Sequence, residues 1–447
     1  MKIKHISLIF IGVFFICSCS KGFETATPEI DIDQDQEIEY TIPIEDALAS
    51  LEEFLIENGI TATKGGTNNY IDSYFPVSLP ATKSFRSAGN ILYAVNFKND
   101  CGYALLSADS RIQEKILAVT DRGSVSETDF LEPSPERAST ENDDLPVAEY
   151  DEILAPGILT LQANPVNLEV KSYAVRQLEA FHKDCKGNES TSETYSWKKT
   201  GEKPRMLNTA WAQRTSNNDI FNKYCPEVGL IWKTKAPAGC VCIAISQIIA
   251  FNEYPEMTCN GQEIDYLEIK KIYCYDNIWN EGSDAGKEML ARLCINVGEL
   301  CKIKYHSIFG NPFGFAWPWD AESCLKTFGY PNVSWNPGYD ERQVIETLNN
   351  DCPVFISALS GFLRGHAWVI DGYIKRDYVS DKGTVKDTQT LVHCNWGWHG
   401  NCNGYFTSGV FHTQEAETYD ECLESTMDEK LYCAFNTITY DSPLDTV

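Results

Sequence analysis

Three segments that lie far apart in the chain carry a thiol, an imidazole and an amide, in that order. Cys240 lies in GCVCIAISQIIAF at the start of a predicted helix, and His366 lies in GHAWVIDGY at the head of a predicted strand. Asn395 lies in HCNWGWHGNCNGYF, beside a tryptophan. A cysteine next to a histidine that an amide orients is an arrangement that supports nucleophilic catalysis. The residue types and their order therefore predict a cysteine nucleophile with a histidine base.

Cys240 has local surroundings that favour a reactive thiolate. Gly239 lets the chain turn sharply before the predicted helix, and apolar residues from Val241 to Ile249 would anchor that helix in a core. The unsatisfied N–H groups and the dipole at a helix N-terminus stabilise an anionic sulfur. The chain has 17 cysteines, so the alternative interpretation is a buried or bridged structural cysteine.

The base must be a histidine that lies within hydrogen-bond reach of the sulfur in space. His366 follows Cys240 by 126 residues and stands between a glycine and a predicted strand that would fix its position. That separation is close to the roughly 130–150 residues typical of papain-like enzymes. His393 and His399 remain rivals because they flank the same group of tryptophans. The alternative for His366 is an ordinary strand-end histidine with a satisfied hydrogen bond.

Further polar residues complete the predicted site. Asn395 would accept the imidazole Nδ1–H through its amide oxygen and hold the ring in the correct tautomer, while Trp396 would shield that bond from water. Gln213, in the sequence WAQ upstream of the cysteine, would donate an amide N–H to an oxyanion. The alternative is that the tryptophan belongs to the core and the asparagine caps a turn.

Length and composition limit the possible classes of protein. A chain of 447 residues with 43% hydrophobic residues can form two or three domains, each with its own core. The formal charge of −27 argues against nucleic-acid binding, because phosphate contacts need clustered lysines and arginines. The cysteine spacing does not match a zinc site, so we expect neither a metal nor an organic cofactor.

The N-terminus is typical of an exported bacterial lipoprotein. Two lysines precede the apolar segment Ile6–Ile16, which is too short to span a bilayer comfortably. A small residue just before Cys19 fits a lipobox, which predicts a signal peptide over 1–18, lipidation of Cys19 and a flexible tether over 19–42. We expect anchoring to a bacterial membrane, at the outer membrane or cell surface, from which processing could release the protein. Secretion without lipidation is the alternative.

Outside Cys17 and Cys19 fifteen cysteines remain, which is an odd number. Export permits disulfides, and an odd count leaves at least one thiol unpaired unless a bridge joins two chains. The pairing of the others does not follow from the sequence.

The first part of the chain predicts a small α+β domain. Apolar residues recur at helical spacing over 44–57. Three strand-like segments follow at 90–97, 103–107 and 115–120, the first two joined by a turn that contains glycine. Residues 123–150 are rich in Ser, Glu, Asp and Pro, which indicates an exposed connector, and a helical segment follows near 167–182.

The remainder predicts a second, larger domain with a helical half and a sheet. We expect helices at 240–252 and 284–301. A run of strands with short connections, which favour antiparallel neighbours, follows at 353–359, 366–374, 388–396, 404–411 and 431–440. A helix that carries the nucleophile and faces a sheet that carries the histidine describes an α+β, papain-like architecture.

Several segments resemble the streptopain family of papain-like cysteine peptidases. The signature segments are GCVCIAISQIIAFNEYP, GHAWVIDGY and NWGWHGNCNGYF, and WAQRTSNNDIFNKYCP at 211–226 resembles the opening of the family's mature enzyme. YAVNFKNDCGYALLSADSRIQEKILAVTDRG at 93–123 resembles its propeptide, which covers the active site until it is removed. The similarity covers most of residues 43–440, with the motifs in the family's order.

The resemblance implies a role for each candidate residue. Cys240 would be the nucleophile, His366 the base and Gln213 the oxyanion-hole donor, with Asn395 and Trp396 as the pair that supports the histidine. It also implies a secreted cysteine endopeptidase made as a zymogen, which acts on protein or peptide substrates and is inhibited by its own propeptide.

The implied domain limits follow from the same resemblance. Residues 43–122 would form the inhibitory prodomain, 123–195 a connector with the processing region, and 196–447 the peptidase domain. Cleavage would fall between about 183 and 205.

The chain also departs from the family's pattern. Cys242 replaces a small residue and is expected in the core, while His399 and Cys402 would alter the rim of the pocket. Two other functions stay open on the sequence. One is a Cys-His amidase or transpeptidase that acts on the cell wall, and the other is a catalytically silent surface-binding lipoprotein.

Overall fold

A computed structural model of the chain describes residues 40–60, 70–79, 89–130, 165–184, 194–214, 220–229, 233–259, 261–308, 311–359, 365–411 and 433–446. The predicted signal peptide, the lipidation site Cys19 and most of the predicted tether lie outside these residues. Within the described ranges, no helix has both the length and the apolar character needed to cross a membrane.

The first part of the chain forms an N-terminal unit, which consists of the described residues 40–60, 70–79 and 89–130 and of helix α3. A four-stranded antiparallel meander runs through β1 (Ile71–Ser78), β2 (Asn90–Phe97), β3 (Tyr103–Ser107) and β4 (Ile116–Thr120). Because successive strand residues point to opposite faces, the meander has two apolar faces. Helix α2 (Ile44–Glu57) packs on one of them and helix α3 (Pro165–Asp184) on the other. The short 3₁₀ segments η2 (Lys98–Asp100) and η3 (Glu127–Phe130) complete the unit.

The described residues between 194 and 446 form a C-terminal domain, whose helical half surrounds α4 (Cys240–Asn252). Helix α4 is buried on nearly all sides because α6, α7 and β14 pack around it. The other helices are α5 (Tyr266–Ile269), α6 (Asp284–Leu300), α7 (Pro318–Thr327) and α8 (Glu341–Asn349). Three two-stranded ribbons belong to this half: β6 (Glu227–Val228) with β7 (Thr234–Lys235), β8 (Thr258–Cys259) with β9 (Gln262–Glu263), and β10 (Lys304–Ile308) with β11 (Asn311–Phe315).

The sheet of the C-terminal domain continues into that of the N-terminal unit. Its strands are β5 (Tyr195–Lys203), β12 (Ser334–Pro337), β13 (Val354–Leu359), β14 (Gly365–Ser380), β15 (Val385–Asn395), β16 (Gly404–Thr407) and β17 (Cys433–Thr439), with 3₁₀ segments η6 (Ser408–Phe411) and η7 (Pro443–Thr446). The hydrogen-bonded order is β1-β2-β3-β4-β16-β15-β14-β13-β17-β12, and β5 pairs with the second half of β14. Antiparallel pairing of residues 118–120 with 404–406, which we call the β4–β16 seam, joins the two parts.

The predicted α+β class is confirmed, as are a helical half, an antiparallel sheet and a preceding small α+β unit. The predicted helices at 44–57 and 240–252 have the observed bounds. The predicted prodomain limit at residue 122 does not coincide with a structural boundary. Helix α3, which falls in the predicted connector, packs on the N-terminal sheet through Val166, Val170 and Ala174. Residues 131–164 of that connector lie outside the described residues.

The cysteines contribute to cores rather than to bridges in the part of the chain that the structure describes. Cys225, Cys242 and Cys294 form no disulfide and are buried thiols. Cys242 lies in the core, as expected, with its sulfur 3.1 Å from the carbonyl oxygen of Cys294.

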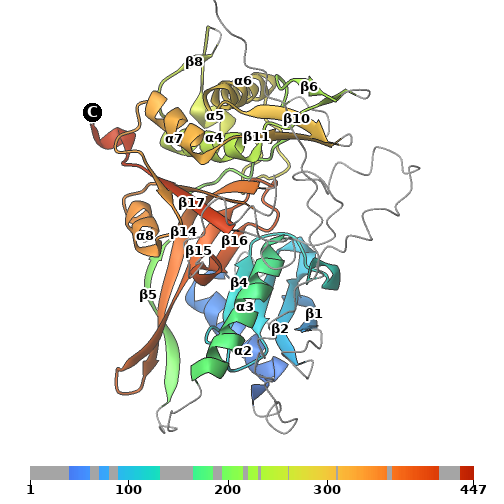
Figure 1. The fold of residues 1–447 in the computed structure, drawn as a ribbon, viewed down its shortest axis with the longest axis vertical. Helices are drawn as coiled ribbons and strands as arrows, with labels where there is room; N and C mark the ends of the chain where they lie inside the picture. The colour runs from blue at the N-terminus through green and yellow to red at the C-terminus, as the bar shows by residue number, and fades with distance from the viewer. Residues whose placement is uncertain are drawn as a thin grey trace, which may run out of the picture.

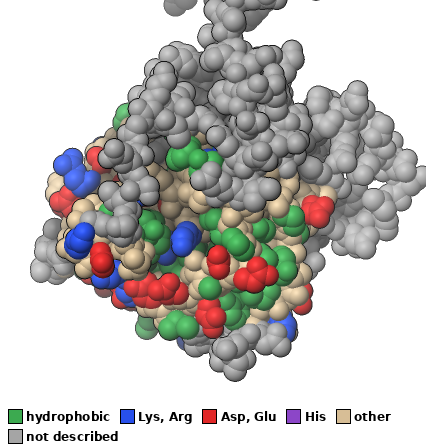
Figure 2. Space-filling model, turned by 90° about the horizontal axis from the view of Figure 1, so that it is seen from below, with side chains coloured by type: hydrophobic (Ala, Val, Ile, Leu, Met, Phe, Trp, Pro, Cys, Tyr) green, Lys and Arg blue, Asp and Glu red, His purple; other side chains and the backbone are tan. Residues whose placement is uncertain are grey.

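The surface keeps the acidic character of the sequence, whose formal charge is −27. On the face drawn in Figure 2, described Asp and Glu side chains lie in groups between apolar ones, and a few basic side chains are scattered among them. Long-range attraction would therefore favour neutral or basic partners.

Candidate active site

Cys240 is the first residue of α4, at the boundary between the helical half and the sheet. Gly239 precedes it with φ of 95°, a left-handed conformation that a side chain would strain, and a Cβ there would lie 3.4 Å from Ile303. Burial raises the pKa of the Cys240 thiol, while the backbone N–H groups of Ala367, Val241 and Cys240 itself oppose that rise. The helix start thus presents N–H groups to the sulfur, as a thiolate requires.

His366 is the second residue of β14 and pairs with Ala358 of β13. Its ring stacks on that of Trp398 with a centroid distance of 4.8 Å, and its Nε2 lies 2.9 Å from the carbonyl oxygen of Trp396. Because a carbonyl can only accept, Nε2 carries the proton and Nδ1 of the neutral ring is left as an acceptor. Nδ1 is buried and has no hydrogen-bond partner among the described residues. Burial lowers the pKa of His366 to about 4, although the Trp396 carbonyl partly offsets this.

Cys240 and His366 line the same pocket, which lies between the start of α4, the segment from β11 to α7, and the ends of β13 and β14. Phe315 and Trp317 form an aromatic wall with ring centroids 4.8 Å apart, and Leu359 adds an aliphatic surface. No hydrogen bond joins the sulfur to the imidazole in the described part of the chain. The fold therefore brings two distant residues to one pocket, with the thiol and the imidazole each in its neutral form.

Gln213 lies beside the start of α4. Its backbone carbonyl accepts a hydrogen bond from the N–H of Ala238 at 2.7 Å, and its neighbour Ala212 forms a bridge with Trp398. The side chain is buried, and its Nε2 has no hydrogen-bond partner among the described residues. A buried amide N–H without an acceptor is costly, and such a group suits a site where an oxyanion develops.

The site lies in a segment that is similar to a known protein family. Residues 211–406 match the model of the Peptidase C10 family, and this segment contains Gln213, Cys240, His366 and Asn395. This segment is similar to the Peptidase C10 family, and residues 211–406 are called the Peptidase C10 domain below after that similarity. The predicted resemblance to streptopain-like cysteine peptidases is thereby confirmed for this part of the chain.

The curated relatives and solved structures extend the comparison. Streptopain of Streptococcus pyogenes is 26% identical over 198 residues, which cover 38% of this chain and 45% of that protein. The serotype M1 streptopain is 25% identical over the same length. The chain thus matches less than half the length of these relatives. A Prevotella intermedia prointerpain A fragment aligns with a TM-score of 0.46 and 17% identity, over 82% of this chain and 98% of that one. Active interpain A aligns with a TM-score of 0.36 and 20% identity, over 53% and 94%.

Asn395 does not contact the imidazole in the Peptidase C10 domain, so the predicted bond from His366 Nδ1–H to its amide oxygen is wrong. Its Nδ2 donates to the carbonyl of Thr209 at 2.7 Å, and its Oδ1 accepts from the N–H of Gly397 at 3.3 Å. The ring is oriented instead by the main-chain carbonyl of the next residue, Trp396, at its other nitrogen.

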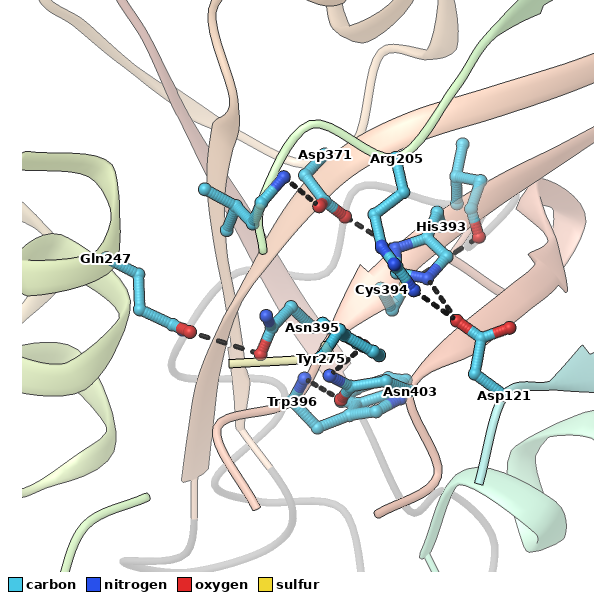
Figure 3. Close-up of polar contacts among 12 residues, drawn as sticks. Asp121, Arg205, Gln247, Tyr275, Asp371, His393, Cys394, Asn395, Trp396 and Asn403 are labelled. Atoms are coloured by element: carbon cyan, nitrogen blue, oxygen red, sulfur yellow. Dashed lines mark hydrogen bonds and ion pairs between the residues drawn. The ribbon is translucent and has the colours of Figure 1, made fainter. Parts of the chain in front are cut away.

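The Asn395 amide belongs to a network that reaches the nucleophile helix (Figure 3). Gln247 on α4 accepts from the Thr209 hydroxyl at 2.9 Å and donates to Asn395 Oδ1 at 3.4 Å. Gln247 follows Cys240 by seven residues, which is two helical turns, so both lie on the same side of α4. The sequence signal for Gln247 is an amide inside a mostly apolar helix.

The structure separates the two rival histidines from the pocket. His393 is fully buried, and its two ring nitrogens lie 2.6 Å from Asp371 Oδ1 and 3.1 Å from Asp121 Oδ2. The ring of His399 packs against that of Tyr273, with centroids 4.7 Å apart. Neither residue lines the pocket that contains Cys240.

The neutral state of the pair predicts a distinct pH dependence for alkylation of Cys240 in the full chain. Burial keeps the thiol pKa above its ordinary value, and a His366 pKa of about 4 excludes an imidazolium partner above that pH. The rate of iodoacetamide modification should therefore rise steadily from about pH 7 to beyond about pH 9, because only the thiolate reacts. Mass spectrometry with fragmentation would separate Cys240 from Cys242, which serves as the internal control. A rate that is already constant between about pH 5 and 7 would contradict the neutral pair.

Proposed function

We propose that the chain is a cysteine-type endopeptidase, exported, lipid-anchored at Cys19 and made as a zymogen. The observation that carries the proposal is the pocket that Cys240, at a helix N-terminus, shares with His366. Because His366 Nε2 donates to the Trp396 carbonyl, its Nδ1 is open as a proton acceptor. The Peptidase C10 match over residues 211–406 supports the same class of reaction.

The proposed reaction has two steps. His366 Nδ1 takes the thiol proton, the Cys240 sulfur forms a bond to the carbonyl carbon of the scissile peptide, and the C=O electron pair moves to the oxygen. The Gln213 amide and the Cys240 backbone N–H would donate to this oxyanion. The imidazolium then protonates the leaving amine as the C–N bond breaks, which leaves a thioester. In the second step His366 removes a proton from water, the hydroxide attacks the thioester, and the protonated thiol is released with the new carboxyl group.

The lining of the pocket favours a peptide with an apolar side chain near the scissile bond. Phe315, Trp317 and Leu359 present aromatic and aliphatic surface beside the reacting pair. The free energy of burying a large apolar side chain, about 1.5–3 kcal/mol, would contribute to substrate affinity. We therefore propose protein or peptide substrates rather than cell-wall glycan.

We further propose that the N-terminal unit is the inhibitory prodomain. It docks through the β4–β16 seam, and in this docked state the thiol and imidazole are both neutral, which fits a latent enzyme. Strand β5 pairs with β14 from Tyr195 onward, so a cut inside it would remove a paired strand. We place processing between residues 184 and 195, in a segment that lies largely outside the described residues.

An epoxide-type cysteine-protease inhibitor tests the enzyme proposal. The full chain would be processed with a small amount of an added protease, then treated with the inhibitor and assayed on casein. We expect covalent labelling and casein hydrolysis in the wild type and in Cys242→Ala, and loss of both in Cys240→Ala. Absence of labelling in the wild type, or hydrolysis of isolated murein without casein, would refute the proposal. Mass spectrometry of the N-terminus of the exported, unprocessed chain tests the acyl chains on Cys19.

A further inference from the structure

A partly buried group of charges lies where the N-terminal unit meets the Peptidase C10 domain (Figure 3). Asp121 directly follows β4, and its Oδ2 accepts one hydrogen bond from Arg205 Nη1 and another from His393 Nε2, each at 3.1 Å. The Asp121 backbone N–H also donates to the carbonyl of Asn403 at 2.7 Å, which extends the β4–β16 seam by one residue. The Asp121 carboxylate of the N-terminal unit therefore accepts hydrogen bonds from two donors outside that unit, Arg205 and His393.

The two donors are held in place by the Peptidase C10 domain and the strand before it. His393 Nδ1 donates to Asp371 Oδ1 at 2.6 Å, and Asp371 Oδ2 accepts from the backbone N–H of Leu207 at 2.8 Å. The guanidinium of Arg205 lies 3.6 Å from the centre of the Tyr275 ring. These contacts orient both donors toward one point, which we call the Arg205–His393 site.

The charges at the site balance only when Asp121 is present. Arg205 and protonated His393 carry two positive charges, and the buried Asp371 carboxylate supplies one negative charge. His393 and Asp371 have no exposed side-chain surface, whereas Asp121 retains 21%. An uncompensated charge in such a place is costly, so the site favours an additional carboxylate.

We propose that the Arg205–His393 site is a carboxylate-binding site for the N-terminal unit, and that Asp121 acts as a charge latch that holds this unit on the Peptidase C10 domain. The inference rests on the proposed zymogen, because it names the contact by which the inhibitory unit would be retained. Release of the unit then depends on whether His393 is charged.

The groups that face His393 determine the direction of the pH effect. They are Asp371 from β14, Asp121 after β4, Arg205 after β5, and Tyr405 from β16, with Tyr275 beyond Arg205. Burial alone would lower the pKa of His393, but Asp371 and Asp121 outweigh it and raise the pKa to about 9. Burial raises the pKa of Tyr275 and of Tyr405, so both stay neutral.

The sign of the effect follows from the raised pKa. Asp371 still faces His393 after release, but Asp121 does not, so the pKa of His393 is higher in the docked state than in the released state. A group whose pKa is raised by docking contributes its full stabilisation below its pKa in the released state. The contribution declines as the pH rises and is lost above about 9, where His393 becomes neutral in the docked state as well. Alkaline conditions should therefore loosen the N-terminal unit, and the effect should require the Asp121 carboxylate.

Hydrogen–deuterium exchange of the full chain tests the latch. The readout is exchange of the backbone amides of residues 118–120 and 404–406, which pair across the seam. Asp121→Asn keeps the size of the side chain and removes its charge, and Arg205→Gln removes one donor from the other side. Asp72→Asn makes the same charge change on the distant strand β1, where the residue is exposed, and is the matched control.

At pH 7 we expect Asp121→Asn and Arg205→Gln each to speed exchange across the seam by roughly tenfold to hundredfold, with Asp72→Asn within about twofold of wild type. The double variant should be no faster than the faster single variant, because both remove one interaction. The difference between wild type and Asp121→Asn should be smaller at pH 9.5 than at pH 7, because His393 has lost its charge, but part of it should remain because Arg205 is still charged. Unchanged exchange in Asp121→Asn, additive effects in the double variant, or a difference as large at pH 9.5 as at pH 7 would overturn the proposal.

This readout does not depend on catalysis, so the two proposals can fail separately. If the processed protein shows no peptidase activity but the exchange results are as expected, the enzyme proposal fails and the docking contact stands. If casein is hydrolysed while Asp121→Asn exchanges like wild type, the latch fails and the enzyme stands.

Discussion

Replacing His366 with glutamine should lower kcat/KM of the processed protein for a peptide substrate by at least about 10³-fold. Glutamine can still donate to the Trp396 carbonyl, but it has no nitrogen that accepts the thiol proton. The thiol would then remain protonated at neutral pH, because burial raises its pKa. Initial rates with a fluorogenic peptide, together with the fraction of protein labelled by the epoxide inhibitor, measure the effect.

The matched control for this prediction is His399→Asn. His399 lies near the same tryptophans and has φ of 52°, a conformation that asparagine tolerates. Its ring packs on Phe221 and Tyr273 and does not line the pocket, so kcat/KM should stay within about threefold of wild type, the range expected for a residue without a catalytic role. A loss in His399→Asn as large as that in His366→Gln would show that the base has been assigned to the wrong histidine.

Replacing Gly404 with alanine should disrupt docking of the N-terminal unit without touching the catalytic pair. An added Cβ would lie 2.4 Å from both the Cα of Thr120 and the carbonyl oxygen of Val119, which are backbone atoms of β4. The clash involves only the seam, since β16 keeps its pairing with β15 on the other side. We expect the unprocessed chain to be labelled by the epoxide inhibitor at least about tenfold faster than wild type, as a loss of about 1.4 kcal/mol in docking would produce.

Gly89→Ala is the control for the seam. Gly89 lies in the N-terminal unit, and a Cβ there would meet no atom within 4 Å. Its labelling rate should match that of wild type. Equal rates for Gly404→Ala and wild type, measured on chains shown to be unprocessed by gel electrophoresis, would mean that the seam does not control access to Cys240.

Local sequence patterns were sufficient to predict the elements in which apolar residues recur at a regular spacing. The helices at 44–57 and 240–252 were predicted with the observed bounds. Apolar residues at helical spacing mark the extent of the first helix. The second begins at Cys240, and the apolar residues that follow mark its extent. Strand β1 was missed because it is mostly exposed and contains Pro76, so it lacks the alternation of a half-buried strand. Strand β14 continues to Ser380, beyond the predicted end at 374, since pairing with β5 stabilises its polar second half.

Only part of the candidate site could be predicted from the sequence. The order of the motifs was enough to bring Cys240 and His366 together, because both belong to regular elements with apolar neighbours. The partner of His366 is a main-chain carbonyl, and a backbone group leaves no signal in residue types. The contact of Asp121 with Arg205 and His393 depends on the register of β4 against β16, which joins segments almost 300 residues apart and which no local pattern specifies.

The β4–β16 seam has a consequence for the protein after processing. Loss of the N-terminal unit would turn β16 from an interior strand into the rim of the remaining sheet, with a row of N–H and C=O groups newly open to other chains. Such a rim is a template for edge-to-edge aggregation. Here it is only four residues long and passes at once into the 3₁₀ segment η6, so it offers little length for a second copy to extend. The brevity of β16 would thus protect the released domain from self-association.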